Sequence, residues 1–131
     1  MAATNLATQL TALVVDDNIL NRKIHQKLLN SVGAKTQGVE NGKEAVDIHF
    51  INGQRFDLIF MDMDMPIMNG IEATKKLRSM GIRSMIIGVS SRSTEAEIRT
   101  FMEAGLDDYQ EKPLTIAKLS SILDKINHNL T

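Results

Sequence analysis

The sequence predicts an α/β fold, a (βα)5 doubly wound, flavodoxin-like parallel sheet of five strands in the order 2-1-3-4-5. Short apolar runs alternate with amphipathic stretches five times along the chain, as in repeated strand–helix units. Three of these runs, residues 12–15, 57–61 and 84–89, show little polar alternation, which is typical of strands covered by helices on both faces. Right-handed crossovers and short connections leave few topologies, and this order is the one we expect.

The first half of the chain supplies two strand–helix units. After the strand at residues 12–15, apolar residues recur every four positions, at Leu20, Ile24, Leu28 and Val32. This period predicts a buried helix face, with Asp17 or Asn18 as the N-cap and Gly33 at the end. A weaker strand over residues 34–39 and a helix over residues 45–50 follow.

The second half supplies three more units. After the strand at residues 57–61, a helix carries Ile71, Leu77 and Met80, and a further strand covers residues 84–89. The fourth helix presents Ile98, Phe101 and Met102 at helical spacing. A short strand over residues 106–110 precedes a last amphipathic helix over residues 116–126.

Length and composition fit one domain. The chain has 131 residues, of which 43% are apolar and 24% charged, so it can bury a single sizeable core. We expect residues 1–10 to form an N-terminal extension and residues 11–131 to form the domain, as a monomer. There are no cysteines, which excludes disulfides, thiolate metal sites and a cysteine nucleophile.

Charge and hydropathy restrict the partners. With 15 Lys and Arg against 16 Asp and Glu, the formal net charge is −1, whereas nucleic-acid binding usually requires a basic excess. The first ten residues have no basic cluster followed by an apolar core, so they are not a secretion signal. No apolar run reaches the length of a membrane helix. We expect a cytoplasmic protein, with the nucleus as a second compartment, and neither nucleic-acid nor membrane partners.

Polar residues collect at the carboxyl ends of the predicted strands. They are Asp16, Asp17, Asp62, Ser90 and Lys112. In open α/β sheets this edge forms the ligand-binding crevice. Three carboxylates in one crevice repel each other, by about 4 kcal/mol for a pair at about 4 Å and an effective dielectric near 20. A hard divalent cation such as Mg²⁺ and a phosphoryl group would relieve that repulsion, and a carboxylate can accept the phosphoryl group covalently.

Each of these residues also has a purely structural interpretation. An Asp-Asp pair after a strand often serves as a helix cap and turn, and Lys112 before Pro113 could be a solvated turn residue. The serines after residue 90 could form an ordinary loop that ends in a helix cap. Their coincidence at one edge favours a functional site.

Four motifs in order give a specific resemblance. They are Val14-Val15-Asp16-Asp17-Asn18, Met61-Asp62-Met63-Asp64-Met65-Pro66 with Asn69-Gly70, Gly88-Val89-Ser90-Ser91 and Glu111-Lys112-Pro113-Leu114. Over residues 11–128 the chain resembles the response-regulator receiver domains of two-component signalling. The residues at 84–91, 101–106 and 111–115 look like the plant type-C regulators, stand-alone receivers of the cytokinin-type relay.

The resemblance implies specific roles. Asp62 would accept a phosphoryl group from a histidine-containing phosphotransfer protein in an Mg²⁺-dependent reaction. Asp17 and Asp62 would bind Mg²⁺ with the Asp64 backbone carbonyl, and Asp16 would lie nearby or bind through water. Ser90 and Lys112 would contact the phosphoryl oxygens, and Tyr109 together with Ser90 would form the conformational switch. Such a protein is not an enzyme but a phosphoacceptor that catalyses its own phosphotransfer and dephosphorylation.

Two positions depart from the common pattern, and some alternatives stay open. Ser90 stands where Thr is more frequent, which keeps the hydroxyl. Asp64 occupies a variable position that tunes phosphoryl lifetime, either by its charge or by acting as a base toward water. The chain could instead be a receiver of a hybrid histidine kinase, a phosphatase using Asp62-x-Asp64, or a binding-only pseudo-receiver. Whether its output is a signal or a phosphoryl sink also stays open.

Overall fold

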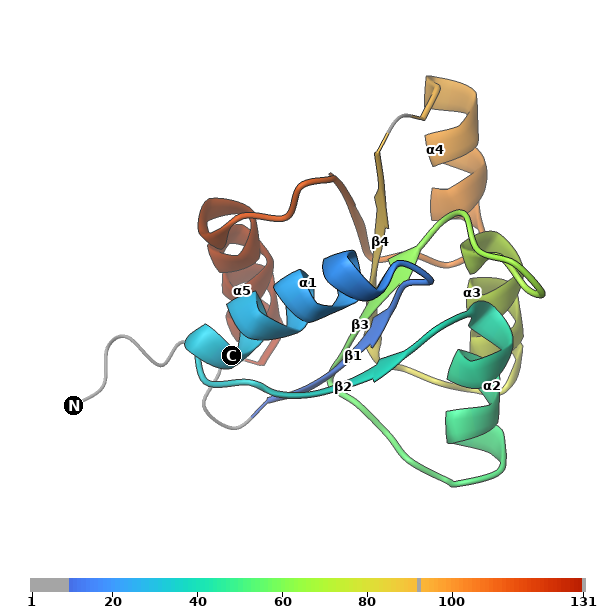
Figure 1. Ribbon diagram of the computed structural model, residues 1–131, viewed down its shortest axis with the longest axis horizontal. Helices are drawn as coiled ribbons and strands as arrows, with labels where there is room; N and C mark the ends of the chain where they lie inside the picture. Colours follow the sequence, from blue (N-terminus) through green and yellow to red (C-terminus); the bar gives the residue numbers. More distant parts are fainter. Residues whose placement is uncertain (1–9, 92, 131) are drawn as a thin grey trace.

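A computed structural model describes residues 10–91 and 93–130, so all but one residue of the predicted extension 1–10 lies outside the described part. The fold is a five-stranded parallel sheet in the order β2-β1-β3-β4-β5 (Figure 1), which confirms the predicted class. The strands are β1 (Thr11–Val15), β2 (Lys35–Val39), β3 (Leu58–Asp62), β4 (Met85–Ser90) and β5 (Asp108–Glu111). The helices are α1 (Ile19–Ser31), α2 (Gly42–Phe50), α3 (Gly70–Ser79), α4 (Glu95–Glu103) and α5 (Ile116–Leu130).

Helices cover both faces of the sheet. Helices α1 and α5 lie on one face, and α2, α3 and α4 lie on the other (Figure 1). Successive strand residues alternate between these two layers: Ala12 and Val14 belong to the α1/α5 core, while Leu13 and Val15 belong to the other. Burial on both faces explains why β1, β3 and β4 read as continuous apolar runs.

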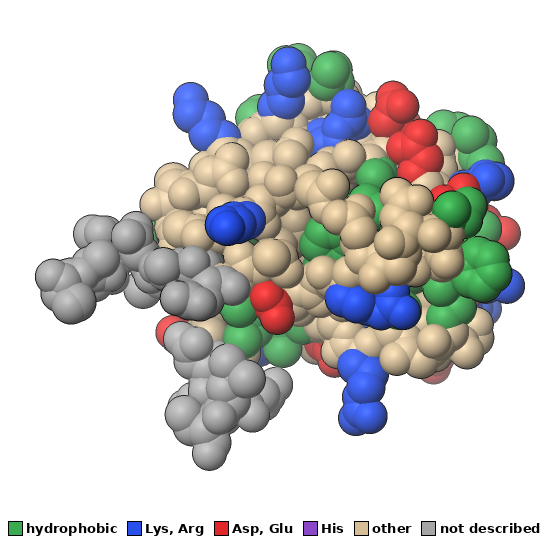
Figure 2. Space-filling model, turned by 90° about the horizontal axis from the view of Figure 1, so that it is seen from below, with side chains coloured by type: hydrophobic (Ala, Val, Ile, Leu, Met, Phe, Trp, Pro, Cys, Tyr) green, Lys and Arg blue, Asp and Glu red, His purple; other side chains and the backbone are tan. Residues whose placement is uncertain are grey.

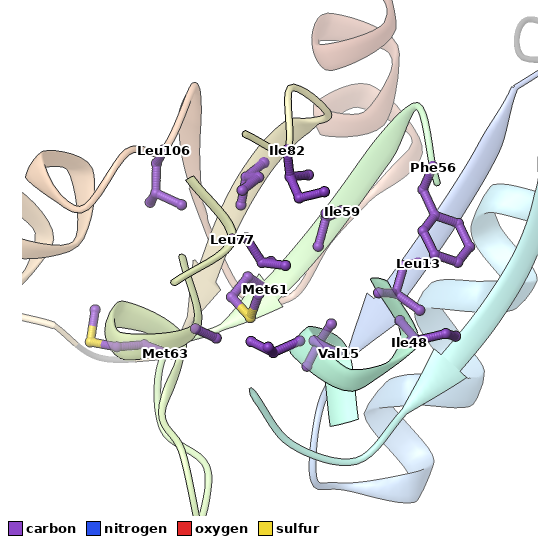
Figure 3. Close-up of a cluster of buried hydrophobic side chains, with 14 of the residues drawn as sticks. Leu13, Val15, Ile48, Phe56, Ile59, Met61, Met63, Leu77, Ile82 and Leu106 are labelled. Carbon is purple, nitrogen blue, oxygen red and sulfur yellow. The ribbon is translucent and has the colours of Figure 1, made fainter. Parts of the chain in front are cut away.

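The core beneath α2 and α3 is drawn in Figure 3. Leu77 of α3 lies beside Ile59 and Met61 of β3, all three fully buried. Burial of side chains of this size contributes roughly 1.5–3 kcal/mol each. This core continues past the last residue of β3 to Met63.

The predicted inner face of α1 is wrong in its first half. Leu20 is 68% exposed and Ile24 54% exposed, whereas His25 and Leu29 are buried. The reason is geometric: a helix turns about 100° per residue, so a four-residue spacing rotates the apolar line by about 40° at each step. Val32 therefore faces the core, while Leu20, three steps earlier, faces solvent. Met102 of α4, also predicted on an inner face, is partly exposed while Phe101 is buried.

Side-chain caps begin four helices at the carboxyl edge of the sheet. The N-caps are Asn18, Asn41, Asn69 and Thr94. Each side-chain oxygen accepts a hydrogen bond from the backbone N–H three residues later, which satisfies a donor that the helix leaves free. Of the two predicted caps for α1, Asn18 is the one used.

Charged side chains of both signs are interspersed on the face seen from below (Figure 2), in line with the nearly balanced composition. Among residues 10–91 and 93–130, no helix is both long enough and apolar enough for a membrane crossing.

Candidate functional site

Sheet register brings two carboxylates side by side at the carboxyl edge. In the parallel pairing of β1 with β3, Val15 lies opposite Met61. The next residue in each case is an aspartate, Asp16 directly after β1 and Asp62 at the end of β3, so both acids leave the sheet at the same level. Lys112 follows β5, and its backbone N–H donates to the carbonyl of Ser90, 2.8 Å away. The loop after β5 is thereby folded back over the end of β4.

Lys112 forms ion pairs with both of these aspartates. Its Nζ lies 2.9 Å from Oδ2 of Asp16 and 3.0 Å from Oδ1 of Asp62. Asp16 is only 1% exposed and Asp62 only 5%. Asp17 is exposed, and ligand oxygens of all three aspartates lie within 4.8 Å of one another. Asp16 and Asp62 therefore form the buried bottom of the cluster. Asp17 forms a side that is open to solvent, here called the acidic wall.

Burial sets the protonation behaviour of the cluster. It raises the pKa of Asp62 to about 6, with a further contribution from the charge of Asp16 and opposition from Lys112. For Lys112, burial is the largest single influence and lowers the pKa. The hydrogen bonds and charges of Asp16 and Asp62 together outweigh it, so the pKa is raised. Asp62 is thus a carboxylate that water does not stabilise, beside a firmly protonated amine.

The loop after β3 is held against the strand end by a close backbone approach. A side chain on Gly70 would place its Cβ 2.1 Å from the carbonyl oxygen of Asp62. The Gly70 N–H also donates to the carbonyl of Met63, 2.8 Å away. Only glycine permits this approach, which explains the Asn69-Gly70 pair noted in the sequence.

Ser90 is linked to two other hydroxyls. It is buried at the end of β4, and its Oγ shares short hydrogen bonds with the Tyr109 hydroxyl and with Ser93 Oγ, the latter at 2.6 Å. The structure therefore brings together the two predicted switch residues. Ser93 was not predicted as a site residue, because its position in a serine-rich stretch before a helix cap looks like an ordinary loop.

Asp64 lies outside the cluster of three carboxylates. It is exposed and lines a shallow hollow between the loop after β3 and helix α4, together with Asn69 and Glu97. Its side chain is therefore placed beside the site rather than at its base.

Exposed apolar residues adjoin the acidic wall. Ile19, Leu20 and Ile24 on the first half of α1 are each more than half exposed, and the first of them follows Asp17 by two positions. Grouped apolar side chains on a surface often mark a contact site for another protein.

The donor set suits Mg²⁺. One lysine cannot neutralise three neighbouring carboxylates, and Mg²⁺ is typically bound by one or two carboxylates together with waters and a phosphate oxygen. The exposed Asp17 leaves one side of the cluster accessible to such ligands.

Known proteins are similar to this chain in sequence and fold. The family model for the response regulator receiver domain matches residues 12–124. Two-component response regulator 24 of Arabidopsis thaliana is 64% identical, over 94% of this chain and 88% of its own length. The Mg²⁺ complex of the receiver domain of the Arabidopsis histidine kinase CKI1 superposes with a TM-score of 0.79 at 32% identity, covering 94% of this chain and 95% of that one.

A third similarity concerns a complex. The Saccharomyces cerevisiae structure of the histidine phosphotransfer protein Ypd1 with the receiver domain of Ssk1 matches with a TM-score of 0.80 at 26% identity, covering 90% of this chain and 88% of that one. The family match spans nearly the whole described fold and includes all the clustered residues. The predicted resemblance is confirmed, and the chain belongs to the response regulator receiver domain family.

Proposed function

We propose that this chain accepts a phosphoryl group on Asp62 from the phosphohistidine of a histidine-containing phosphotransfer protein. The observation that carries the proposal is the environment of Asp62: buried, paired with Lys112 and next to two further carboxylates. A carboxylate so poorly solvated is a more reactive nucleophile than one surrounded by water. Membership of the receiver family and the similarity to a receiver seen with a phosphotransfer protein support the same reaction.

The transfer exchanges one bond for another. A carboxylate oxygen of Asp62 attacks phosphorus, forming an O–P bond as the N–P bond to the donor imidazole breaks, and the electron pair stays on the imidazole nitrogen. In hydrolysis, a water oxygen attacks the same phosphorus and forms a new O–P bond as the O–P bond to Asp62 breaks, which releases inorganic phosphate with the water's protons and returns Asp62 to a carboxylate. The protein needs no outside substrate beyond the donor, so it acts as a signalling phosphoacceptor that catalyses its own transfer and dephosphorylation.

The surrounding residues bind and orient the transferred group. Asp16, Asp17 and Asp62 would hold Mg²⁺, with the backbone carbonyl of Asp64 as a further ligand. When bound, the ion would neutralise charge on the carboxylates and the phosphoryl oxygens. Lys112 supplies a charge-assisted contact.

Conformational change would begin at Ser90. Its hydroxyl can turn from Ser93 and Tyr109 toward a phosphoryl oxygen, since a serine hydroxyl both donates and accepts. Tyr109 would then lose or change a partner, which would transmit the event toward α4 and β5.

The donor would dock on the apolar surface of α1. Ile19, Leu20 and Ile24 are exposed next to the acidic wall, so a partner bound there could present a phosphohistidine to Asp62. Docking at this surface would account for the exposed apolar residues on the outward side of this helix.

Phosphotransfer can be tested directly. The chain is mixed with a ³²P-labelled phosphotransfer protein, with Mg²⁺ or with EDTA, and label on both proteins is followed over time. We expect Mg²⁺-dependent labelling of wild type, at least a hundredfold less on Asp62→Asn, and wild-type labelling of Asp124→Asn, whose carboxylate is exposed on α5. Equal labelling of Asp62→Asn would place the acceptor elsewhere.

We further propose that the chain works as a stand-alone module of a plant cytokinin-type relay and drains phosphoryl groups from its donor. The similarity to a plant response regulator along most of that protein's length supports the module. A drain requires a short-lived acyl phosphate, and Asp64 lies beside the site with its carboxylate in solvent. There it could accept a proton from an attacking water.

The lifetime of the acyl phosphate tests the drain. Phosphorylated wild type is purified, and loss of label is followed with Mg²⁺ present. We expect a several-fold slower loss from Asp64→Asn and no change for Glu97→Gln, which lines the same hollow from the opposite side. A wild-type half-life of many hours would contradict the drain. Equal decay of wild type and Asp64→Asn would remove Asp64 from the mechanism.

A further inference from the structure

The turn that presents Asp17 is fixed at the residue before it. The backbone N–H of Asp16 donates to the carbonyl of Val39, 3.2 Å away. Its carboxylate accepts from the N–H of Asn18 and from Lys112, each at 2.9 Å. The remaining polar group, the carbonyl oxygen of Asp16, accepts a hydrogen bond from Nη1 of Arg22 at 2.7 Å.

The Arg22 contact acts on the geometry of Asp17. The carbonyl of Asp16 and the N–H of Asp17 belong to one planar peptide group. A donor that fixes the direction of this carbonyl therefore also fixes the plane from which the Cα and side chain of Asp17 depart. Arg22 is half-buried. A hydrogen bond from its charged guanidinium is therefore stronger than the same bond would be in open water.

Gly38 on edge strand β2 makes room for the arginine. A Cβ at this position would lie 2.9 Å from Cδ and 3.1 Å from Cγ of Arg22, and 2.9 Å from Oε1 of Gln26. The alkyl stem of Arg22 thus lies across the bare backbone of Gly38 on its way to Asp16. The atoms that a methyl group would meet belong to flexible side chains. Alanine at position 38 would therefore move Arg22 aside and leave the strand intact.

We infer that Arg22 is a positioning residue for the proposed Mg²⁺ site, and that the absence of a side chain at Gly38 provides the space that the Arg22 side chain requires. The pair would act without touching the ion: Gly38 admits the stem, Arg22 holds the Asp16 carbonyl, and the turn presents the Asp17 carboxylate. The inference rests on the proposed function only in taking Asp17 as a metal ligand.

The first test is the affinity for Mg²⁺, measured by titration calorimetry at fixed ionic strength. Arg22→Met keeps an apolar stem but has no donor, and we expect it to bind Mg²⁺ roughly five- to tenfold more weakly, near the lower limit for residues that orient metal ligands. Arg22→Lys, which keeps a cationic donor, should recover part of the loss. Gln26→Ala, which removes the other neighbour of Gly38, should bind like wild type.

The pairing of Arg22 with Gly38 gives a sharper test. Gly38→Ala alone should weaken Mg²⁺ binding several-fold, although position 38 contributes no ligand. In the Arg22→Met background the same change should have no further effect on affinity, because the contact it disturbs is already lost. Equal losses in both backgrounds would show that Gly38 acts independently of Arg22 and would overturn the inference, as would unchanged affinity in Arg22→Met.

A measurement without metal separates this inference from the proposed function. Amide hydrogen exchange at Asp17 and Asn18 in the Mg²⁺-free protein should be faster in Arg22→Met and Gly38→Ala than in wild type and Gln26→Ala. If wild type binds no Mg²⁺, the proposed metal site fails, and this exchange still decides whether Arg22 orders the turn. Unchanged exchange in both variants would refute the positioning role.

Discussion

The two edges of the sheet, at the amino ends and at the carboxyl ends of the strands, differ in how their charged side chains are paired. At the amino edge, Arg78 at the end of α3 donates to the carbonyls of Ile82, Ser84 and Gly105, and pairs with Asp107 at 2.8 Å. The Asp107 carboxylate also accepts the N–H of Ile86. At the carboxyl edge, one ammonium serves two buried carboxylates, with a third beside them.

This difference separates a structural cluster from the proposed functional site. The amino-edge contacts join α3 to the strands that follow it, and there one guanidinium pairs with one carboxylate. At the carboxyl edge, burial and neighbouring charge raise the pKa of Asp62, so its ionisation opposes folding. A protein that keeps such a group forgoes stability for a reactive site. Substitutions of the aspartates at the two edges should accordingly change stability in opposite directions, and substitutions of the cations should differ in their response to Mg²⁺.

The largest effect should come from removing each edge's cation. Lys112→Met should lower the free energy of unfolding without Mg²⁺ by roughly 3 kcal/mol, because it leaves two buried carboxylates without their partner. Arg78→Met should lower it too, mainly because three backbone carbonyls lose their donor. Saturating Mg²⁺ should restore more stability to Lys112→Met than it adds to wild type, since the ion would replace the missing charge. Its effect on Arg78→Met should equal that on wild type.

Urea unfolding with and without Mg²⁺ checks this prediction, with circular dichroism as the probe. Equal Mg²⁺ increments for Lys112→Met and Arg78→Met would show that the lysine does not compensate the same charges as the metal.

Neutralising one aspartate at each edge should change stability in opposite directions. The folded-state pKa of Asp62 is about 6 against an ordinary value of 3.8, so the folded protein binds the proton more tightly than the unfolded chain. Its penalty on stability appears as pH rises between these values and is complete above pH 6. Without Mg²⁺ at pH 7.5, Asp62→Asn should therefore be more stable than wild type, by roughly 2–3 kcal/mol at about 1.4 kcal/mol per pKa unit.

Asp107→Asn provides the matched comparison. It should be less stable than wild type by roughly 1 kcal/mol at pH 7.5, because it weakens the contacts to Arg78 and Ile86. Unfolding curves from pH 3.5 to pH 7.5 should show the advantage of Asp62→Asn shrinking toward zero as wild-type Asp62 becomes protonated. If Asp62→Asn were less stable than wild type throughout this range, Asp62 would not be a carboxylate whose ionisation opposes folding.

The clustering of the candidate site residues could be predicted, because the ends of apolar strands can be recognised in the sequence. Asp16 and Asp62 each follow an apolar run, and parallel pairing places the ends of neighbouring strands together. The outward side of α1 could not be predicted from spacing alone, since the rotation per residue carries Leu20 and Ile24 away from the core that Leu29 enters.

Contacts between side chains that lie far apart in the sequence could not be predicted from local patterns. Nothing in the local pattern of β2 indicates that Gly38 makes room for Arg22, because the strand is short, mostly exposed and at an edge. The position of Ser93 depends on the path of the loop after β4, and a serine-rich sequence does not determine that path. Such contacts need the folded chain.

The smallest effect that still distinguishes the edges concerns Ser93. Its Oγ lies 2.6 Å from Ser90 Oγ, which also bonds to the Tyr109 hydroxyl. Ser93→Ala should reduce stability by no more than about 1 kcal/mol, the value of one ordinary hydrogen bond. The same change in Ser79, whose hydroxyl bonds to the Lys76 carbonyl near the amino edge, should have a similar or smaller effect. Only Ser93→Ala should alter phosphotransfer: with one competing partner gone, Ser90 turns more readily toward the phosphoryl group, and acceptance from a labelled phosphotransfer protein should be two- to fivefold faster. If Ser93→Ala and Ser79→Ala accept label at the wild-type rate, Ser93 is a loop residue without influence on the switch.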